Sequence, residues 1–459
     1  QNSSGGSISG LESYFLRGNY NYGGKYYVTF TGRADKSTKF GPNNRWGVFP
    51  SGALAWRISE EAFLKRFNFI NDIKLRISAG RTGSANFGDF LYSTYFSTGG
   101  SFYNGSGGVI PNIVPNPDIR WETTEQLDAG LDFSLFANKL RGSVTYYSKL
   151  TKDLILSVPV PNETGAANQL TNIGDVLNKG VEIQLGSDII SNKNFTWSTD
   201  FNISFNKNLL KKLNGGTLPN GSLLIENEPL SYFYGYKTAG LFQNQSEIDA
   251  LNAASPTKIY QASKTGPGDI KFVDVNNDGQ VIPDDMVKLG NAEPDFFGGW
   301  NHSLRYKRIS LSALFNYSVG NVLYNSSQAS LSIFNSYLSN YTTDILNSWT
   351  PENPNTNVPR VVARNPNQNG RTSDRYVNSA SFFRLKNIHI SYLLNAPWLS
   401  KAHLNSVRVF ASATNVFTIT GYNGLDPEVN TGPGNALTER YVGSGYPQTR
   451  SFSFGVSAV

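Results

Sequence analysis

The sequence predicts an all-β fold, a transmembrane antiparallel β-barrel with long extracellular loops. Three observations support it: apolar and polar residues alternate over long segments, aromatic residues gather at the ends of those segments, and tight turns alternate with long polar connections. Charged residues make up 16% of the 459 residues, which is below the share of about 25% that is usual in soluble domains.

The alternation is clearest at residues 195–206. Phe195, Trp197, Phe201, Ile203 and Phe205 share one face, and most of the positions between them are polar. Side chains alternate across a strand, so such a segment has one apolar face and one polar face. A β-sandwich shows the same pattern, but its strands are usually about 5 or 6 residues long. Strands that cross a membrane need about 9 to 11 residues, and the segments here favour the barrel.

We expect about thirteen strands from this pattern. They lie at residues 11–22, 25–35, 46–59, 72–83, 121–136, 139–157, 179–190, 195–206, 297–306, 309–320, 380–394, 405–419 and 449–459. Their ends carry aromatic clusters such as SYFLRGNYNY at 13–22 and WGVFPSGALAW at 46–56. Aromatic residues are expected where barrel strands meet the two membrane interfaces.

The connections between these strands are sorted by side. Short links at 23–24, 138–139, 191–194 and 307–308, with moderate ones at 60–71 and 395–404, fall on one side, and long polar links at 84–120, 158–178, 207–296, 321–379 and 420–448 fall on the other. Outer-membrane barrels have short periplasmic turns and long extracellular loops. We therefore expect 207–296 to be a large extracellular loop insertion.

The same parity makes the first strand start from the outside. An odd number of strands that begins there implies that earlier strands are missing. We therefore expect residues 1–459 to be the C-terminal portion of one transmembrane barrel domain.

Composition narrows the classes of function. The chain has no cysteine, which excludes thiolate metal sites and disulfides, and no run of 18 apolar residues that could form a transmembrane helix. No run of lysine and arginine reaches four residues, so a nucleic-acid partner is not expected. The three histidines are scattered, and neither an HExxH motif nor a GxSxG motif occurs. We therefore expect that the protein is not an enzyme.

The segment 274–285, DVNNDGQVIPDD, has the spacing of a calcium-binding loop. Such a loop offers oxygen ligands from positions 1, 3 and 5, a carbonyl at position 7 and an acid at position 12, with glycine at position 6. The matching ligands here are Asp274, Asn276, Asp278, Gln280 and Asp285. The sequence therefore predicts structural calcium, while the alternative is a plain turn, which Asn, Asp and Gly also favour.

Aromatic residues in the long links are candidates for contact with a substrate or a partner. Their rings suit stacking on sugars or packing against another protein. The candidates are Tyr92, Tyr95, Phe96, Phe102 and Tyr103 in one link and Trp349 in another. The alternative is that these rings pack within their own loops.

Several longer motifs together resemble one known family. They include NPDIRWETTEQLDAGLDF, GDIKFVDVNNDGQVIPDDMVKLGNAEPDFFGGW, NSWTPENPNTNVPR, GLDPEV and YPQTRSFSFGVSAV. In this order along nearly the whole chain they are similar to the barrel of SusC/RagA-type TonB-dependent outer-membrane transporters. The resemblance implies a complete barrel of about 22 strands, filled by an N-terminal plug domain that this chain does not contain.

The resemblance also implies a function and partners. Such transporters import oligosaccharides or peptides across the bacterial outer membrane, with a SusD-like surface lipoprotein as a lid and with TonB engaged through the N-terminal region. Polar residues on the inward face would then hold the plug, namely Asp128, Asp132, Glu182, Gln184, Asp200 and Asn202. Two other functions stay open: a passive porin, and a structural or adhesion barrel component of a larger outer-membrane complex.

Overall fold

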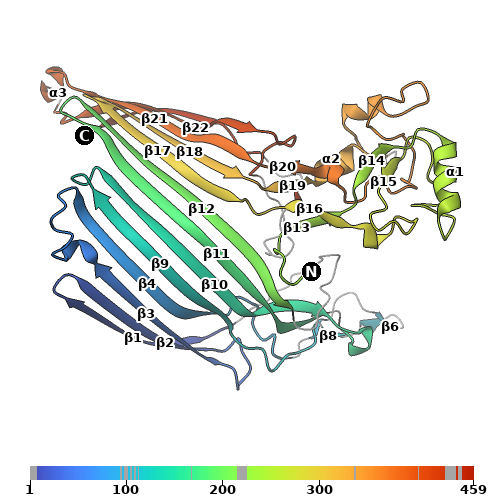
Figure 1. Ribbon diagram of the computed structural model, residues 1–459, viewed down its shortest axis with the longest axis horizontal. Coiled ribbons are helices and arrows are strands. Elements are labelled where there is room, and N and C mark those ends of the chain that lie inside the picture. Colours follow the sequence, from blue (N-terminus) through green and yellow to red (C-terminus); the bar gives the residue numbers. More distant parts are fainter. Residues whose placement is uncertain are drawn as a thin grey trace.

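One antiparallel sheet of thirteen strands dominates the computed structural model (Figure 1). The structure describes residues 8–93, 96–97, 102–103, 106–107, 110–111, 113–166, 168–213, 225–334, 338–401, 403–428, 441–442 and 447–459. The strands of the sheet are β1 (Leu11–Tyr22), β2 (Tyr26–Ser37), β3 (Trp46–Arg57), β4 (Ile70–Ser84), β9 (Glu122–Leu135), β10 (Leu140–Pro159), β11 (Asn168–Ser191), β12 (Phe195–Leu213), β17 (Phe296–Tyr306), β18 (Ile309–Val319), β21 (Phe382–Leu394), β22 (Val407–Thr420) and β24 (Ser451–Ala458). Their number confirms the prediction.

Each strand of this sheet pairs with the barrel strand that precedes or follows it in the chain. Within the described part of the chain, β1 and β24 each pair on one side only, so the sheet is an open wall of a barrel. No helix among the described residues is long and apolar enough to cross a membrane.

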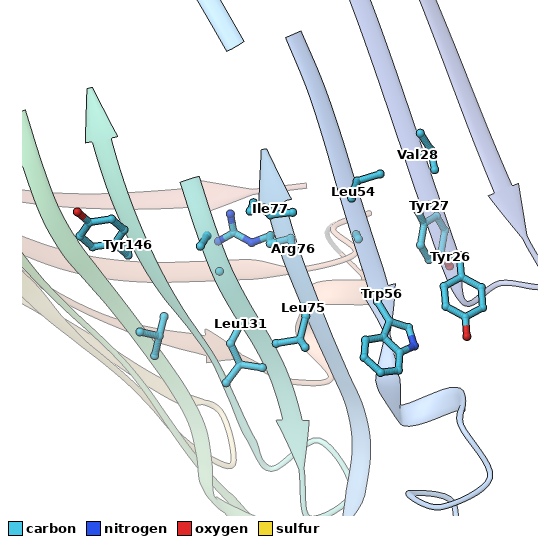
Figure 2. Close-up of a pocket in the computed structure, with 14 residues that line it drawn as sticks. Tyr26, Tyr27, Val28, Leu54, Trp56, Leu75, Arg76, Ile77, Leu131 and Tyr146 are labelled. Carbon is cyan, nitrogen blue, oxygen red and sulfur yellow. The ribbon is translucent and has the colours of Figure 1, made fainter. Parts of the chain in front are cut away.

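The register places apolar and polar side chains on opposite faces. Val144, Ile183 and Ile203 form one cross-strand row, and the adjacent row consists of Thr145, Glu182 and Ser204. This confirms the predicted alternation. Figure 2 shows part of the apolar face, where a shallow pocket is lined by residues of β2, β3, β4, β9 and β10 that include Tyr26, Val28, Leu54, Trp56, Leu75, Ile77, Leu131 and Tyr146.

Aromatic residues border the apolar face at both ends of the strands. The rings of Tyr26 and Trp56 stack 6.4 Å apart at the end with the tight turns. At the other end the rings of Tyr14 and Trp46 stack 6.3 Å apart. Two such borders are typical of a barrel that crosses a membrane.

The tight turns lie together at one end of the sheet, on the left in Figure 1. Gly23 and Gly24 both have positive φ, 60° and 68°, a conformation that glycine adopts readily and that suits a hairpin turn. The helices α3 (Trp398–Lys401) and η1 (Ile58–Glu60) occupy the two moderate links at this end. We call it the turn end, and the opposite end the loop end.

Three strands are longer than predicted at the loop end. The link expected at 158–178 is largely strand, because β11 begins at Asn168, and β12 continues to Leu213. The pairing of β10 with β11 passes a register shift near Leu154 and continues to the pair of Pro159 and Asn168. The alternation of apolar residues fades beyond the membrane, whereas backbone pairing does not depend on it.

The long connections add smaller elements at the loop end. They are β5 (Phe96–Ser97), β6 (Phe102–Tyr103), β7 (Ser106–Gly107), β8 (Ile110–Pro111), η2 (Asn162–Thr164), β13 (Tyr232–Gly235), β14 (Thr238–Leu241), α1 (Gln245–Ala254), β15 (Ile270–Phe272), η3 (Pro283–Asp285), β16 (Val287–Asn291), β19 (Val322–Asn325), α2 (Ser326–Leu331), η4 (Thr343–Asn347), η5 (Asp374–Tyr376), β20 (Val377–Ser379) and β23 (Tyr441–Val442). The elements from β13 to β16 and from β19 to β20 gather on the right in Figure 1.

The two faces of β11 lead to a mutational prediction. Ile183→Arg places a charge on the apolar face, and we expect it to destabilise the assembled barrel by about 2–4 kcal/mol. Gln184→Arg is the matched control because Gln184 is an exposed residue on the polar face. The measurement is urea unfolding of the full-length protein in lipid vesicles. Equal destabilisation by the two variants would contradict the assignment of faces.

Candidate functional site

Two long connections share one hydrophobic core at the loop end. The core contains Phe242 and Phe272 from the link between β12 and β17, and Tyr376 from the link between β18 and β21; these side chains are at most 1% exposed. Burial raises the pKa of Tyr376 to about 12. We call the folded unit formed by residues 225–295, 320–334 and 338–381 the loop body.

Short strand pairs build the loop body. Strand β13 pairs with β16, and β14 pairs with β15. Strand β19 pairs with β20 and, in parallel, with β23 from the link between β22 and β24. Helix α1 is capped by Asn244, whose side chain accepts a hydrogen bond of 2.9 Å from the backbone N–H of Glu247, the arrangement that favours helix starts. Three long connections therefore meet in this region.

A buried carboxylate joins the two main connections. Asp269 is 0% exposed, and its oxygens accept hydrogen bonds from Arg360 Nε at 3.0 Å and Arg360 Nη2 at 2.8 Å. Asn369 Nδ2 donates to the same carboxylate at 3.0 Å, as does the backbone N–H of Gly266 at 2.8 Å. A buried charge is tolerated when it is paired and fully hydrogen-bonded, and this one is.

Buried amides extend this network. Gln261 Nε2 and Thr265 Oγ1 donate to Asn367 Oδ1 at 2.6 and 2.7 Å, and Asn367 Nδ2 donates to the carbonyl of Ile270 at 3.1 Å. The backbone N–H of Ile270 donates to Asn369 Oδ1 at 3.0 Å. A satisfied polar network specifies one arrangement of the segments it joins, so the loop body is a defined surface.

A second ion cluster attaches a loop to the inward face of the wall. Arg384 of β21 is 1% exposed and lies 2.7 Å from Asp426 and 2.6 Å from Glu428, measured between nitrogen and oxygen. Asn316 Nδ2 donates to Glu428 Oε1 at 3.2 Å. The cluster fixes the start of the link after β22 against β18 and β21.

Four of the predicted calcium ligands lie in the loop body between β15 and η3, and the fifth, Asp285, is the last residue of η3. Asp274 Oδ2 accepts from the N–H of Gly279 at 2.7 Å, and Asp278 Oδ1 accepts from the N–H of Gln280 at 2.9 Å. Asn276 Oδ1 accepts from the N–H of Asp278 at 2.9 Å. These contacts make a tight loop in which Gly279 has a φ of 86°.

Asp285 is the most deeply buried of the predicted calcium ligands. It is 0% exposed, and it accepts N–H donors from Val275 at 2.8 Å and from Ile282 at 2.9 Å. Among the described residues, no group of three or more His, Cys, Asp and Glu side chains converges as a metal site. The types and spacing of the oxygens fit calcium, and in this conformation the carboxylates hold the loop's own amides.

The aromatic candidates fall in different environments. Tyr92 packs against the buried cluster of Phe40, Phe49, Ile119 and Trp121. Trp349 is 9% exposed in the core of the loop body, and its Nε1 donates to Gln243 Oε1 at 3.1 Å. These positions favour packing within the loops, and contact of either ring with a substrate stays a prediction.

The other aromatic candidates are described only in part. Tyr95 lies outside the described residues. Phe96 belongs to β5, and Phe102 and Tyr103 belong to β6. For these three the structure describes the backbone alone, so their contacts also stay a prediction.

The inward face carries the predicted polar residues. Asp132 lies 3.1 Å from Lys74 and 3.2 Å from Arg76, between nitrogen and oxygen. Asp128 accepts from Gln126 Nε2 at 2.8 Å and from Ser78 Oγ at 3.3 Å. These contacts, most of them between neighbouring strands, make the inward face a hydrophilic wall at the height where the outward face is apolar.

Two ion-paired groups were not predicted from the sequence, namely Asp269 with Arg360, and Arg384 with Asp426 and Glu428. Asp269 and Arg360 stand in the motifs GDIKF and NVPR, and Asp426 and Glu428 stand in GLDPEV. Each motif was recognisable, but the separation of 91 residues between Asp269 and Arg360 hid their contact. Arg384 could have been noticed as a charged residue on a strand that is otherwise rich in apolar residues.

Comparison with known proteins agrees with this architecture. Residues 2–350 match the family model described as TonB dependent receptor-like, beta-barrel. TonB-dependent receptor P3 of Formosa agariphila is 37% identical over 468 residues, covering 97% of this chain and 45% of the relative. TonB-dependent receptor SusC of Bacteroides thetaiotaomicron is 32% identical over 465 residues, covering 97% of this chain and 43% of that relative. The chain thus spans about half the length of these curated relatives.

A solved structure matches the fold over nearly the whole chain. The RagAB peptide transporter superposes with a TM-score of 0.80 at 26% sequence identity, covering 98% of this chain and 47% of that chain. With the open wall, its two-faced strands and the family match over most of its length, the chain belongs to the TonB-dependent receptor β-barrel family of the bacterial outer membrane.

Proposed function

We propose that the full-length protein imports peptides or oligosaccharides across the outer membrane, driven by TonB, with a SusD-like surface lipoprotein as a lid. The observation that carries the proposal is the loop body, a defined platform built from separate connections at one end of a membrane-spanning wall. A passive pore has less need of such a platform than a transporter that must seat a second protein.

The relatives support the same reading. The chain is similar along its length to SusC and to a component of a peptide transporter. Peptides and oligosaccharides are both long polar solutes, and the hydrophilic inward face of the wall suits either. TonB would act through an N-terminal region of the full-length protein, and the polar inward residues would hold the plug.

We further propose that calcium braces the loop body at residues 274–285. A carboxylate oxygen that accepts one amide still has a lone pair for a cation, so the contacts of Asp274 and Asp278 do not exclude a metal. Binding requires Asp285 and the exposed acids to converge. The metal would stiffen the exposed segment between β15 and β16 and would supply no catalytic chemistry.

The aromatic link between β4 and β9 is proposed as a contact region. Tyr95, Phe96, Phe102 and Tyr103 stand close together in the sequence, and strand β6, which contains the last two, lies at the loop end. Rings there would pack against the lid or against the cargo.

A co-purification experiment tests the proposed function. The full-length protein, extracted from its native membrane in mild detergent, is expected to hold a surface lipoprotein in a stoichiometric complex. Reversing the charge of an exposed residue of the loop body, Asp249→Lys, should weaken that complex if helix α1 faces the lid. Mass spectrometry of the purified complex gives the measurement.

Two outcomes would contradict the import proposal. If the protein purifies without a lipoprotein but with a different large partner, the structural or adhesion role is favoured. Diffusion of small sugars through the protein in vesicles lacking TonB would favour a passive porin.

Removal of calcium tests the metal proposal. Calcium at about one hundred times its Kd should stabilise the loop body by about 2.7 kcal/mol, and a chelator should make residues 225–295 more sensitive to protease. The double variant Asp274→Asn, Asp278→Asn should lose this response. Asp284→Asn, an exposed acid at a position that is not a ligand, should keep it. If a chelator changes nothing in the unmodified protein, the segment is only a turn.

A further inference from the structure

Two lysines face each other across neighbouring strands. Lys179 of β11 is paired directly with Lys207 of β12, and both are exposed. Side chains that are directly opposite on one face lie about 5 Å apart at Cβ, and like charges in this arrangement are destabilising. The pair therefore requires an explanation.

Both lysines lie on the apolar, outward face of the wall. The neighbouring outward row toward the turn end consists of Val181 and Phe205, and the next row toward the loop end consists of Leu177 and Leu209. The inward rows between them carry Gly180 with Asn206 and Asn178 with Asn208. Asn208 Nδ2 donates to Asn178 Oδ1 at 2.8 Å, which confirms that the amides share the other face.

The position along the strand places the pair at the outer interface of the membrane. Lys207 lies twelve residues beyond Phe195, the first residue of β12, which at about 3.4 Å per residue and a tilt of about 45° corresponds to a height of roughly 29 Å. The apolar band of a barrel is about 25 Å tall. The loop end of such barrels faces outward, so the two ammonium groups lie at the level of the outer-leaflet head groups.

Two other outward cations near this level have acidic partners. Lys152 Nζ lies 2.7 Å from Glu125, and Lys36 Nζ lies 3.5 Å from Glu12. In the described part of the chain, neither Lys179 nor Lys207 forms an ion pair within 4.0 Å. Two adjacent cations are thus left without a carboxylate, above apolar rows that suit acyl chains.

We propose that Lys179 and Lys207 together bind a phosphate group of an outer-leaflet lipid. One phosphate between the two ammonium groups would convert their repulsion into two charge-assisted contacts. Ser148, which is paired with Lys179 on the adjacent strand, brings a hydroxyl to the same row. The acyl chains of the lipid then lie along Val181 and Phe205. The occupant is a phosphorylated glycolipid, which is the characteristic lipid of that leaflet.

The test compares lipid retention by charge variants of the full-length protein. The double variant Lys179→Gln, Lys207→Gln is purified in mild detergent, and the bound phosphorylated glycolipid is measured by mass spectrometry. Each lysine near an anionic surface contributes about 1 kcal/mol, so retention should fall at least about fivefold. The double variant Lys179→Arg, Lys207→Arg should retain the lipid, since arginine also binds phosphate.

A matched control uses exposed lysines at the turn end. Lys193→Gln with Lys307→Gln removes the same charge and should leave retention unchanged. Added glycolipid without its phosphates should bind the unmodified protein at least about fivefold more weakly than the phosphorylated form, reflecting loss of the same lysine contacts.

Three results would overturn the proposal. The first is equal lipid retention by the Lys179, Lys207 glutamine variant and the turn-end control. The second is equal binding of the phosphorylated glycolipid and the glycolipid without phosphate. The third is displacement of the lipid by millimolar inorganic phosphate, which would indicate simple anion binding. Heat-modifiable migration of the folded barrel shows that each variant has assembled. If the glutamine variant fails to assemble, the arginine variant provides the test. It should retain the phosphorylated glycolipid more strongly than the glycolipid without phosphate, and equal retention of the two lipids would overturn the proposal.

Discussion

The need to pair every backbone N–H and C=O group within the membrane governs this structure. Water is absent from the hydrocarbon region, so each strand must find its hydrogen-bond partners on adjacent strands. The strands from β2 to β22 in the main sheet meet this need by pairing on both sides in chain order, while β1 and β24 each pair on one side within the described residues. Once the backbone is paired, the alternation of side chains decides which face meets lipid and which face meets the lumen.

This constraint explains why much of the wall could be predicted from the sequence. Ile203 and Phe205 must lie on one face and Asn202 and Ser204 on the other, because a strand alternates with a period of two. The strand prediction was less accurate beyond the membrane, where the two faces of a strand no longer have to differ in polarity. Residues 168–178 were expected to be part of a loop, yet they pair with β10 above the membrane, where neither face has to be apolar.

The loop body was beyond the reach of sequence patterns. Its arrangement depends on contacts such as Asp269 with Arg360, which are 91 residues apart in the chain. A buried carboxylate is indistinguishable in sequence from an exposed one, and Trp349 gave no sign that its ring is buried. The acids at 274–285 form a tight turn in the structure, and their convergence on a metal stays a prediction that depends on conformation. The loop body presents one defined surface at the loop end of the sheet.

The assignment of the apolar face to lipid is tested most directly by measuring the environment of consecutive side chains along β12. Because residues 1–459 contain no cysteine, single cysteines at positions 200 to 205 of the full-length protein can carry spin labels in lipid vesicles. We expect labels at Phe201→Cys, Ile203→Cys and Phe205→Cys to be relaxed by oxygen dissolved in lipid and shielded from a water-soluble nickel complex, with the intervening positions not showing this preference. Labels on the odd-numbered positions that respond mainly to the water-soluble complex would contradict the assignment of the apolar face to lipid.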